Sequence, residues 1–246
     1  MLIFLRSLLF SVGTVVATVV FSVGALFTLP FPFSVRYGFV IRWAWFVMWW
    51  LKVTCGVRYQ VRGLENVPGT NAILFSKHQS TWETLAIQKI FPAQAWVLKK
   101  ELLTLPFFGW ALRLMEPIAI DRNAGSAAVK KLIKDGKARL ALGRWVVVFP
   151  EGTRVAPGQV GRYGIGGALL AQASRYPVVP MAHNAGEFWP RRGFLKRPGT
   201  ITVSIGPVIE TKGRKADEIM ALAKTWIENE MDRISSLQAD HSTSLE

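Results

Sequence analysis

The chain has 246 residues, which suffices for one domain of ordinary size and an anchoring segment. Half of the residues are hydrophobic, the formal net charge is +14, and ten residues are tryptophan. Nucleic-acid-binding proteins are basic but usually polar, so this composition argues against nucleic acid and favours an anionic lipid surface, where indole rings also accumulate. The single cysteine, Cys55, excludes an intrachain disulfide, and we interpret it as a packed side chain.

The amino terminus, residues 1–54, is predicted to be a membrane anchor of two helices. Residues 7–29 carry no charge. As a helix they would extend roughly 35 Å, against about 30 Å of bilayer hydrocarbon. Pro30 and Pro32 then break the helix. Residues 35–54 mix tryptophans with three cations, so this second helix is expected to lie in the membrane interface with its cations reaching outward.

The orientation of this anchor follows from its flanking charges. The sequence leaves open whether the first helix crosses the bilayer or dips into it. If it crosses, Arg36, Arg42 and Lys52 outweigh Arg6, which predicts an inner-membrane protein whose carboxyl-terminal part faces the cytoplasm. A cleaved signal peptide is the alternative, but the apolar run exceeds the usual core of about 7–15 residues.

Residues 55–236 show short apolar runs that alternate with helical patterns. Helical periodicity is clearest over residues 129–140 and 219–227. This alternation predicts an α/β fold, a mixed sheet flanked by helices, behind the two-helix anchor. Residues 237–246 are predicted to be a flexible tail. The strands are expected at residues 57–62, 72–75, 95–98, 117–120, 145–149, 178–181 and 201–205.

The first chemical motif follows the apolar run 72–75 and contains His78 and Glu83. Ser80 and Glu83 have the spacing of a capping box, which predicts a helix that begins at Ser80. The positive end of that helix would keep His78 neutral and available as a base. Because His78 precedes the helix, Glu83 can fold back and fix the imidazole tautomer, as the Asp of a Ser-His-Asp triad does. Alternatively, Glu83 only caps Ser80 and His78 is an ordinary loop residue.

The second motif follows the apolar run 146–149 and comprises Glu151, Gly152, Thr153 and Arg154. A glycine turn with an arginine beside it is typical of phosphate binding. An ordinary strand-to-helix turn with a surface arginine is the alternative. Between the two motifs, the apolar run 117–120 is followed by Arg122.

These blocks, in this order, resemble the glycerolipid acyltransferase family, and within it the 1-acyl-sn-glycerol-3-phosphate acyltransferases. His78 and Glu83 correspond to the family's HxxxxD block, with Glu where Asp is usual. Arg122 ends the second block, residues 149–154 match FPEGTR letter for letter, and residues 179–180 correspond to the fourth block. The resemblance covers residues 56–207, and a two-helix anchor also occurs in the family.

The resemblance implies transfer of a fatty acyl group from acyl-CoA or acyl-carrier protein to the sn-2 hydroxyl of lysophosphatidic acid, which gives phosphatidic acid. It implies that His78 is the general base, oriented by Glu83, without cofactor or metal. Backbone amides at the helix start or at residues 151–152 would hold the oxyanion. Arg122, Arg154 and Lys100 would bind the acceptor phosphate.

The same blocks also fit an acyltransferase for another acceptor, such as a lyso-ornithine lipid or glycerol 3-phosphate. A non-catalytic membrane tether is disfavoured, because a tether would not require His78, Glu83 and Arg154. A hydrolase and a nucleotide-binding protein are disfavoured because GxSxG, GxxxxGK and GxGxxG are missing.

His183 either faces the site or is a structural histidine, and no close ligand pair supports zinc. The basic stretch 189–197 either binds lipid headgroups or an acidic carrier protein, or is a solvated loop.

Overall fold

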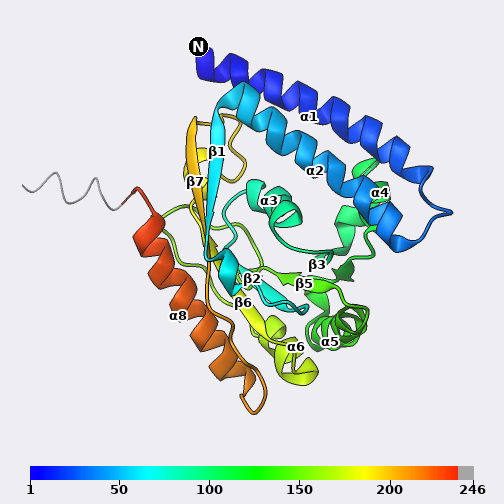
Figure 1. The fold of residues 1–246 in the computed structure, drawn as a ribbon, viewed down its shortest axis with the longest axis vertical. Helices are drawn as coiled ribbons and strands as arrows, with labels where there is room; N and C mark the ends of the chain where they lie inside the picture. Colours follow the sequence, from blue (N-terminus) through cyan, green and yellow to red (C-terminus); the bar gives the residue numbers. More distant parts are fainter. Residues whose placement is uncertain (238–246) are drawn as a thin grey trace, which may run out of the picture.

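The computed structural model describes residues 1–237, apart from the side chain of Arg122. The predicted tail therefore lies outside the described residues, except for Leu237. Two antiparallel helices open the chain, α1 (Leu2–Leu26) and α2 (Phe33–Cys55), joined by a turn that contains both expected prolines. In Figure 1 this hairpin runs along one side of the molecule.

A seven-stranded sheet forms the centre of the fold, with the order β1-β7-β6-β2-β5-β3-β4. All neighbouring strands are parallel except β6 and β7, so the expected mixed sheet is confirmed. Each predicted run is a strand, with ends that differ by at most two residues. The strands are β1 (Val57–Arg62), β2 (Ile73–Ser76), β3 (Gln94–Lys99), β4 (Ile118–Ile120), β5 (Trp145–Val148), β6 (Val178–His183) and β7 (Gly199–Ile205).

Helices cover both faces of the sheet, and alternate strand residues point to opposite layers. Leu74 and Val147 pack with α2 and α3, whereas Phe75 and Val148 pack with α5, α6 and α8. Both faces are therefore buried, which explains the nearly continuous apolar runs of these strands. The remaining helices are α3 (Trp82–Ile90), α4 (Phe108–Leu114), α5 (Ser126–Ala141), α6 (Gly166–Ser174), α7 (Ala185–Phe188) and α8 (Ala216–Ile234), with 3-10 turns at Leu64–Asn66, Lys100–Thr104 and Arg122–Ala124.

The second helix differs from the expected interfacial helix because one of its faces belongs to the protein core. Val47 and Leu51 are fully buried, whereas Trp45 and Trp49 on the other face are about half exposed. Arg36, expected to reach outward, instead donates to the Glu116 carboxylate at 2.9 Å. This helix is therefore held against the sheet layer at one end by an ion pair and along its length by apolar packing.

The first helix packs on the second along one face and leaves the other uncovered. Trp43 Nε1 donates to Thr18 Oγ1 at 3.1 Å, and a Cβ at Gly13 would lie 2.2 Å from the Trp50 side chain, so only glycine lets the helices approach there. By length and composition α1 is apolar enough to cross a membrane. Its exposed apolar side chains include Leu2, Phe4, Leu9, Val12, Val16, Val20 and Val23.

Candidate active site

The loop between β2 and α3 brings His78 and Glu83 together. Helix α3 begins at Trp82, two residues after the predicted start, because Ser80 Oγ accepts from the Trp82 N–H at 3.1 Å. The Glu83 carboxylate accepts from the N–H groups of Ser80 at 2.9 Å and Gln79 at 3.0 Å, and its Oε1 lies 2.8 Å from His78 Nδ1. Glu83 therefore caps the helix and also contacts the imidazole, so it does more than the capping role that was the alternative.

The environment of Glu83 favours its ionised form. Burial raises the pKa of Glu83, but the nearby rings of His183 and His78 and the Ser80 N–H outweigh burial, so the pKa is lowered overall. An ionised Glu83 accepts the proton of His78 Nδ1, which leaves Nε2 as an acceptor. The His78 ring also stacks on Phe149 of the second motif, with centroids 4.0 Å apart.

His183 lies behind this pair and does not line the cavity described below. Its Nε2 donates to the Lys77 carbonyl at 2.8 Å, its Nδ1 accepts from the Ala185 N–H at 3.3 Å, and Glu83 Oε2 lies 3.9 Å from Nε2. Burial lowers the pKa of His183, which keeps the ring neutral. Because both ring nitrogens have hydrogen-bond partners, we interpret His183 as a structural residue. Separately, the described residues form no cluster suited to a metal ion.

Glu151 was predicted to contact substrate, but its carboxylate points into the protein. It accepts from Lys77 Nζ and from the His78 N–H, both at 2.9 Å, and from the Gly161 N–H at 3.2 Å. Lys77 Nζ, only 1% exposed, also contacts the Glu228 carboxylate of α8 at 2.9 Å. Glu151 therefore ties the second motif to the backbone of His78.

Several of the amides expected to hold an oxyanion already have partners within the protein. Those of Gln79 and Ser80 donate to Glu83, that of His78 donates to Glu151, and that of Gly152 donates to the Phe149 carbonyl at 2.9 Å. Gly152 has φ +64, a left-handed conformation that favours glycine and closes the turn before Thr153 and Arg154. The turn thus positions side chains and does not present these amides to a ligand.

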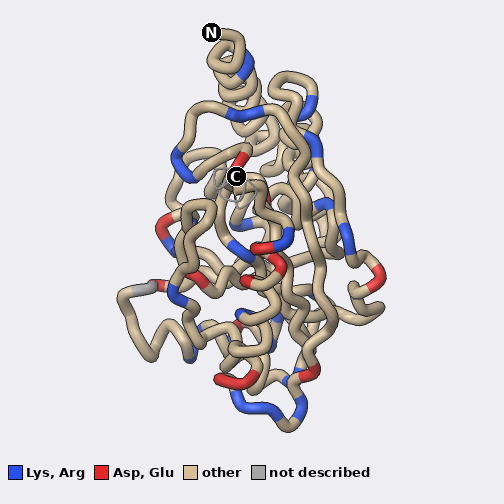
Figure 2. The backbone as a smooth tube through the Cα atoms, turned by 90° about the vertical axis from the view of Figure 1, so that its left-hand side faces the viewer, with Lys and Arg blue, Asp and Glu red and all other residues tan. Residues whose placement is uncertain are grey.

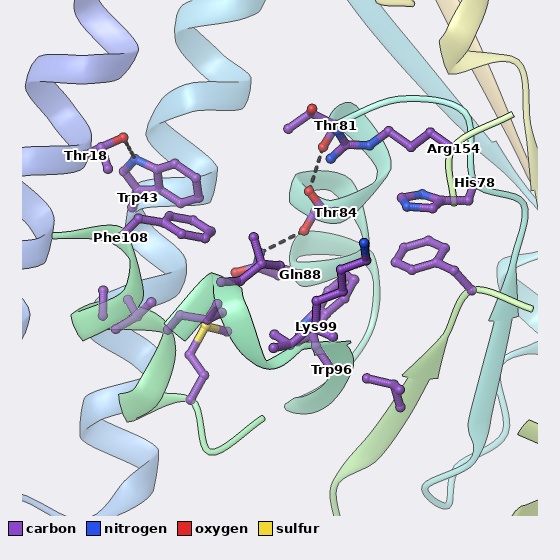
Figure 3. Close-up of a pocket in the computed structure, with 18 of the residues that line it drawn as sticks. Thr18, Trp43, His78, Thr81, Thr84, Gln88, Trp96, Lys99, Phe108 and Arg154 are labelled. Carbon is purple, nitrogen blue, oxygen red and sulfur yellow. Dashed lines mark hydrogen bonds between the residues drawn. The ribbon is translucent and has the colours of Figure 1, made fainter. Parts of the chain in front are cut away.

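A cavity of about 480 Å³ opens in front of His78 and extends to the hairpin. One end is apolar, with walls from α1, α2 and α4 that include Phe21, Val40, Trp43, Phe108 and Leu112. The other end is cationic, and of the described residues that line the cavity none is Asp or Glu. Figure 3 shows His78, Arg154 and Lys99 extending into one space, opposite Trp43 and Phe108. The four cations are Lys99, Arg154, Arg191 and Arg192.

Of the three cations predicted to bind phosphate, only Arg154 is seen to line the cavity. Arg154 lines the cavity, and burial, together with the nearby Arg191, lowers the pKa of its guanidinium. Lys100 does not line the cavity, because its ammonium contacts Asp121 at 2.6 Å on the surface. The preceding Lys99 faces the cavity instead. Arg122 begins the 3-10 turn after β4, and its side chain lies outside the described residues.

Three cations of the cavity lie outside the predicted set of site residues: Lys99, which the sequence did not single out, and Arg191 and Arg192. Lys99 is the last residue of β3, and the carboxyl end of a strand is where α/β proteins place ligand sites, so this signal was present. The two arginines belong to a basic stretch whose role the sequence left open.

The arrangement places a histidine, held by a buried carboxylate, beside a cavity suited to a ligand that is anionic at one end and apolar at the other. The model of the acyltransferase family matches residues 58–184. The chain therefore belongs to the acyltransferase family.

Relatives within this family are similar over most of the chain. The 1-acyl-sn-glycerol-3-phosphate acyltransferase of Pseudomonas aeruginosa is 45% identical over 239 residues, which cover 95% of this chain and 93% of the relative. The 1-acyl-sn-glycerol-3-phosphate acyltransferase alpha of Bos taurus is 30% identical over 70% of this chain and 61% of its own length. A crystal structure of the Thermotoga maritima 1-acyl-sn-glycerophosphate acyltransferase, 22% identical, has the same fold, with a TM-score of 0.79 over 94% of this chain and 95% of that one.

Proposed function

We propose that this protein transfers a fatty acyl group from a thioester to the sn-2 hydroxyl of lysophosphatidic acid and so makes phosphatidic acid. The observation that carries the proposal is the position of His78, whose ring faces a cavity that is cationic at one end and apolar at the other. Lysophosphatidic acid has the same two ends, a phosphate and an acyl chain. The name of the Pseudomonas relative supports the same acceptor.

In the proposed reaction, His78 Nε2 accepts the proton of the acceptor hydroxyl, and the resulting oxygen attacks the thioester carbonyl. The tetrahedral intermediate then expels the thiolate, which takes the proton back from the imidazolium. Glu83, 2.8 Å from Nδ1, stabilises the imidazolium while it exists. No covalent enzyme intermediate and no cofactor are needed, and acyl-CoA or acyl-carrier protein serves as co-substrate.

The acceptor phosphate is proposed to bind Arg154 and Lys99, near the turn of Gly152 and Thr153. Arg154 Nε is buried without a hydrogen-bond partner, which fits a donor that is satisfied by a ligand. Arg122 remains a proposed phosphate ligand through its place in the second block. Lys100 is a less suitable ligand because Asp121 already holds its ammonium.

The hairpin is proposed to bind membrane lipids. The exposed apolar face of α1 fits the hydrocarbon region, and the first 64 residues contain basic but no acidic residues. Around the amino terminus, marked N in Figure 2, the coloured segments are the blue of Lys and Arg. Because α1 packs on α2 and α4, and Thr18 and Ser22 of α1 line the cavity, we favour a hairpin that dips into one leaflet. The cytoplasmic face of the inner membrane remains the proposed location.

An acceptor panel tests this function. Purified protein in detergent receives labelled acyl-CoA or acyl-carrier protein and, separately, lysophosphatidic acid, glycerol 3-phosphate or a lyso-ornithine lipid. We expect phosphatidic acid from lysophosphatidic acid at a kcat/KM at least tenfold above the other acceptors. Equal or faster transfer to another acceptor would refute the assignment.

A further inference from the structure

The cavity mouth carries a turn, residues 190–193, that is tied to both chemical motifs. On one side, Ser80 Oγ donates to the Trp189 carbonyl at 2.6 Å. On the other side, Arg191 Nη1 donates to the Arg154 carbonyl at 2.7 Å. These two hydrogen bonds link the turn to the loops that hold His78 and Arg154. The turn itself lies more than 30 positions beyond Arg154 in the sequence.

The shape of this turn is specified locally. The Gly193 N–H donates to the Pro190 carbonyl at 2.9 Å, and a Cβ at Gly193 would lie 2.5 Å from Pro190 Cγ, so a larger residue does not fit. Arg192 has φ +58, a left-handed conformation that a residue with a side chain rarely adopts. Strained residues of this kind gather at ligand-binding sites, where the surrounding structure holds them in place.

The charged residues that line this end of the cavity are cationic. Arg191 and Arg192 line the cavity together with Lys99 and Arg154, and the described lining contains no carboxylate. Like charges that face one space repel each other, so a built cluster of this type is suited to an anionic ligand.

Two phosphate-bearing ligands must share the cavity if the proposed function holds, and they differ in reach. The acceptor phosphate is only a few bonds from the hydroxyl that His78 deprotonates, so it must lie deep, beside the half-buried Arg154. In the donor, the pantetheine arm separates the phosphate ester from the thioester. That phosphate must therefore lie at the mouth, where Arg191 and Arg192 are exposed.

We propose that Arg191 and Arg192 form a second phosphate-ester site, which holds the phosphate at the end of the donor's pantetheine arm. This inference rests on the proposed function. Coenzyme A and the prosthetic group of acyl-carrier protein both present this phosphate ester, so the site serves either donor.

Steady-state kinetics of an Arg191→Gln/Arg192→Gln double variant test the proposal. We expect the KM for the acyl donor to rise at least tenfold, and by more than the KM for lysophosphatidic acid. The Arg191→Lys/Arg192→Lys variant should recover most of the loss because it keeps the charge. Arg197→Gln is the matched control, since Arg197 is exposed in the same stretch and does not line the cavity. Melting temperatures establish that the variants are folded.

A binding measurement separates this proposal from the proposed function. Coenzyme A and phosphopantetheinylated carrier protein are titrated calorimetrically, without acceptor. Wild type should bind at least one of them, and the double glutamine variant should bind it at least tenfold more weakly. The proposal is overturned if wild type binds neither, if both proteins bind equally, if the KM for lysophosphatidic acid rises instead, or if only binding to phosphatidylglycerol vesicles is lost. Failure of wild type to acylate lysophosphatidic acid would refute the proposed function alone.

Discussion

Charged side chains on the two sides of the His78 loop differ in their partners. Behind the loop, Lys77 is buried between the carboxylates of Glu151 and Glu228, and Tyr163 donates to Glu228 at 2.6 Å. In front of it, four cations line a cavity without a carboxylate among its described lining residues. A buried charge is tolerated only when it is paired, so the rear cluster is structural. The four cations of the cavity, the front cluster, need no carboxylate partner because they can contact water or a ligand. The contrast separates charges that stabilise the fold from charges that are suited to binding.

The largest effect on stability is expected from breaking the rear cluster. Lys77→Met leaves Glu151 and Glu228 without their cation, which should lower the free energy of unfolding by about 3–5 kcal/mol. Urea unfolding in detergent, followed by circular dichroism, measures the loss. Lys100→Met removes a surface ion pair as a control and should have no measurable effect. A Lys77→Met variant as stable as wild type would contradict the assignment of this cluster.

The front cluster should respond through binding and not through stability. Arg154→Gln removes a charge-assisted hydrogen bond worth about 1.5–3 kcal/mol, which corresponds to a rise in the KM for lysophosphatidic acid of roughly 10- to 100-fold. The slow acylation of a monoacylglycerol, which lacks the phosphate, should not change. If Arg154→Gln lowers both activities equally, Arg154 does not act through the phosphate.

Two adjacent lysines offer a closer comparison. Lys99 lines the cavity and Lys100 pairs with Asp121, so Lys99→Gln should raise the KM for lysophosphatidic acid severalfold while Lys100→Gln leaves it unchanged. Initial rates at varied acceptor concentration decide between them. The opposite ranking would restore the original interpretation of Lys100 as a phosphate ligand.

The smallest effect concerns acid stability. Because burial holds the pKa of His183 below its ordinary 6.5, the unfolded chain takes up this proton more readily than the folded chain as the pH falls below 6.5. The folded state then loses stability by at most about 1.4 kcal/mol per pH unit. His183→Gln should flatten the dependence of the unfolding free energy on pH between 6.5 and 5.5. Identical slopes in both proteins would show that His183 is not the group responsible. Glu83, whose pKa is also lowered, adds a loss in the same direction below about 4.5.

Much of the fold was predictable because its strands are short apolar runs between glycines, prolines and charges. The pairing of His78 with Glu83 was predictable because a first-turn carboxylate can reach a residue just before its helix. Local pattern also predicted α5 and α8, whose apolar residues recur on one face. The short helices α4 and α7 span too few residues to show such a period, and α6 is too apolar to show a face.

The roles of several site residues depend on contacts that the sequence does not reveal. Glu151 points inward because Lys77, 74 positions earlier, is buried beside it. Arg191 lines the cavity and bonds to the backbone of Arg154, a contact between segments far apart in the sequence. Whether Lys99 or Lys100 faces the cavity depends on where β3 ends, and a sequence pattern predicts the ends of a strand less accurately than its centre.

The central claim is that His78 acts as the general base, and its removal tests this most directly. Acyl transfer to lysophosphatidic acid is measured in detergent for wild type, His78→Ala and Glu83→Gln, with melting curves to establish folding. We predict that kcat of folded His78→Ala falls by about 10²–10⁴ and that Glu83→Gln also loses activity, because the imidazolium is no longer stabilised. A folded His78→Ala protein with wild-type activity would contradict the mechanism.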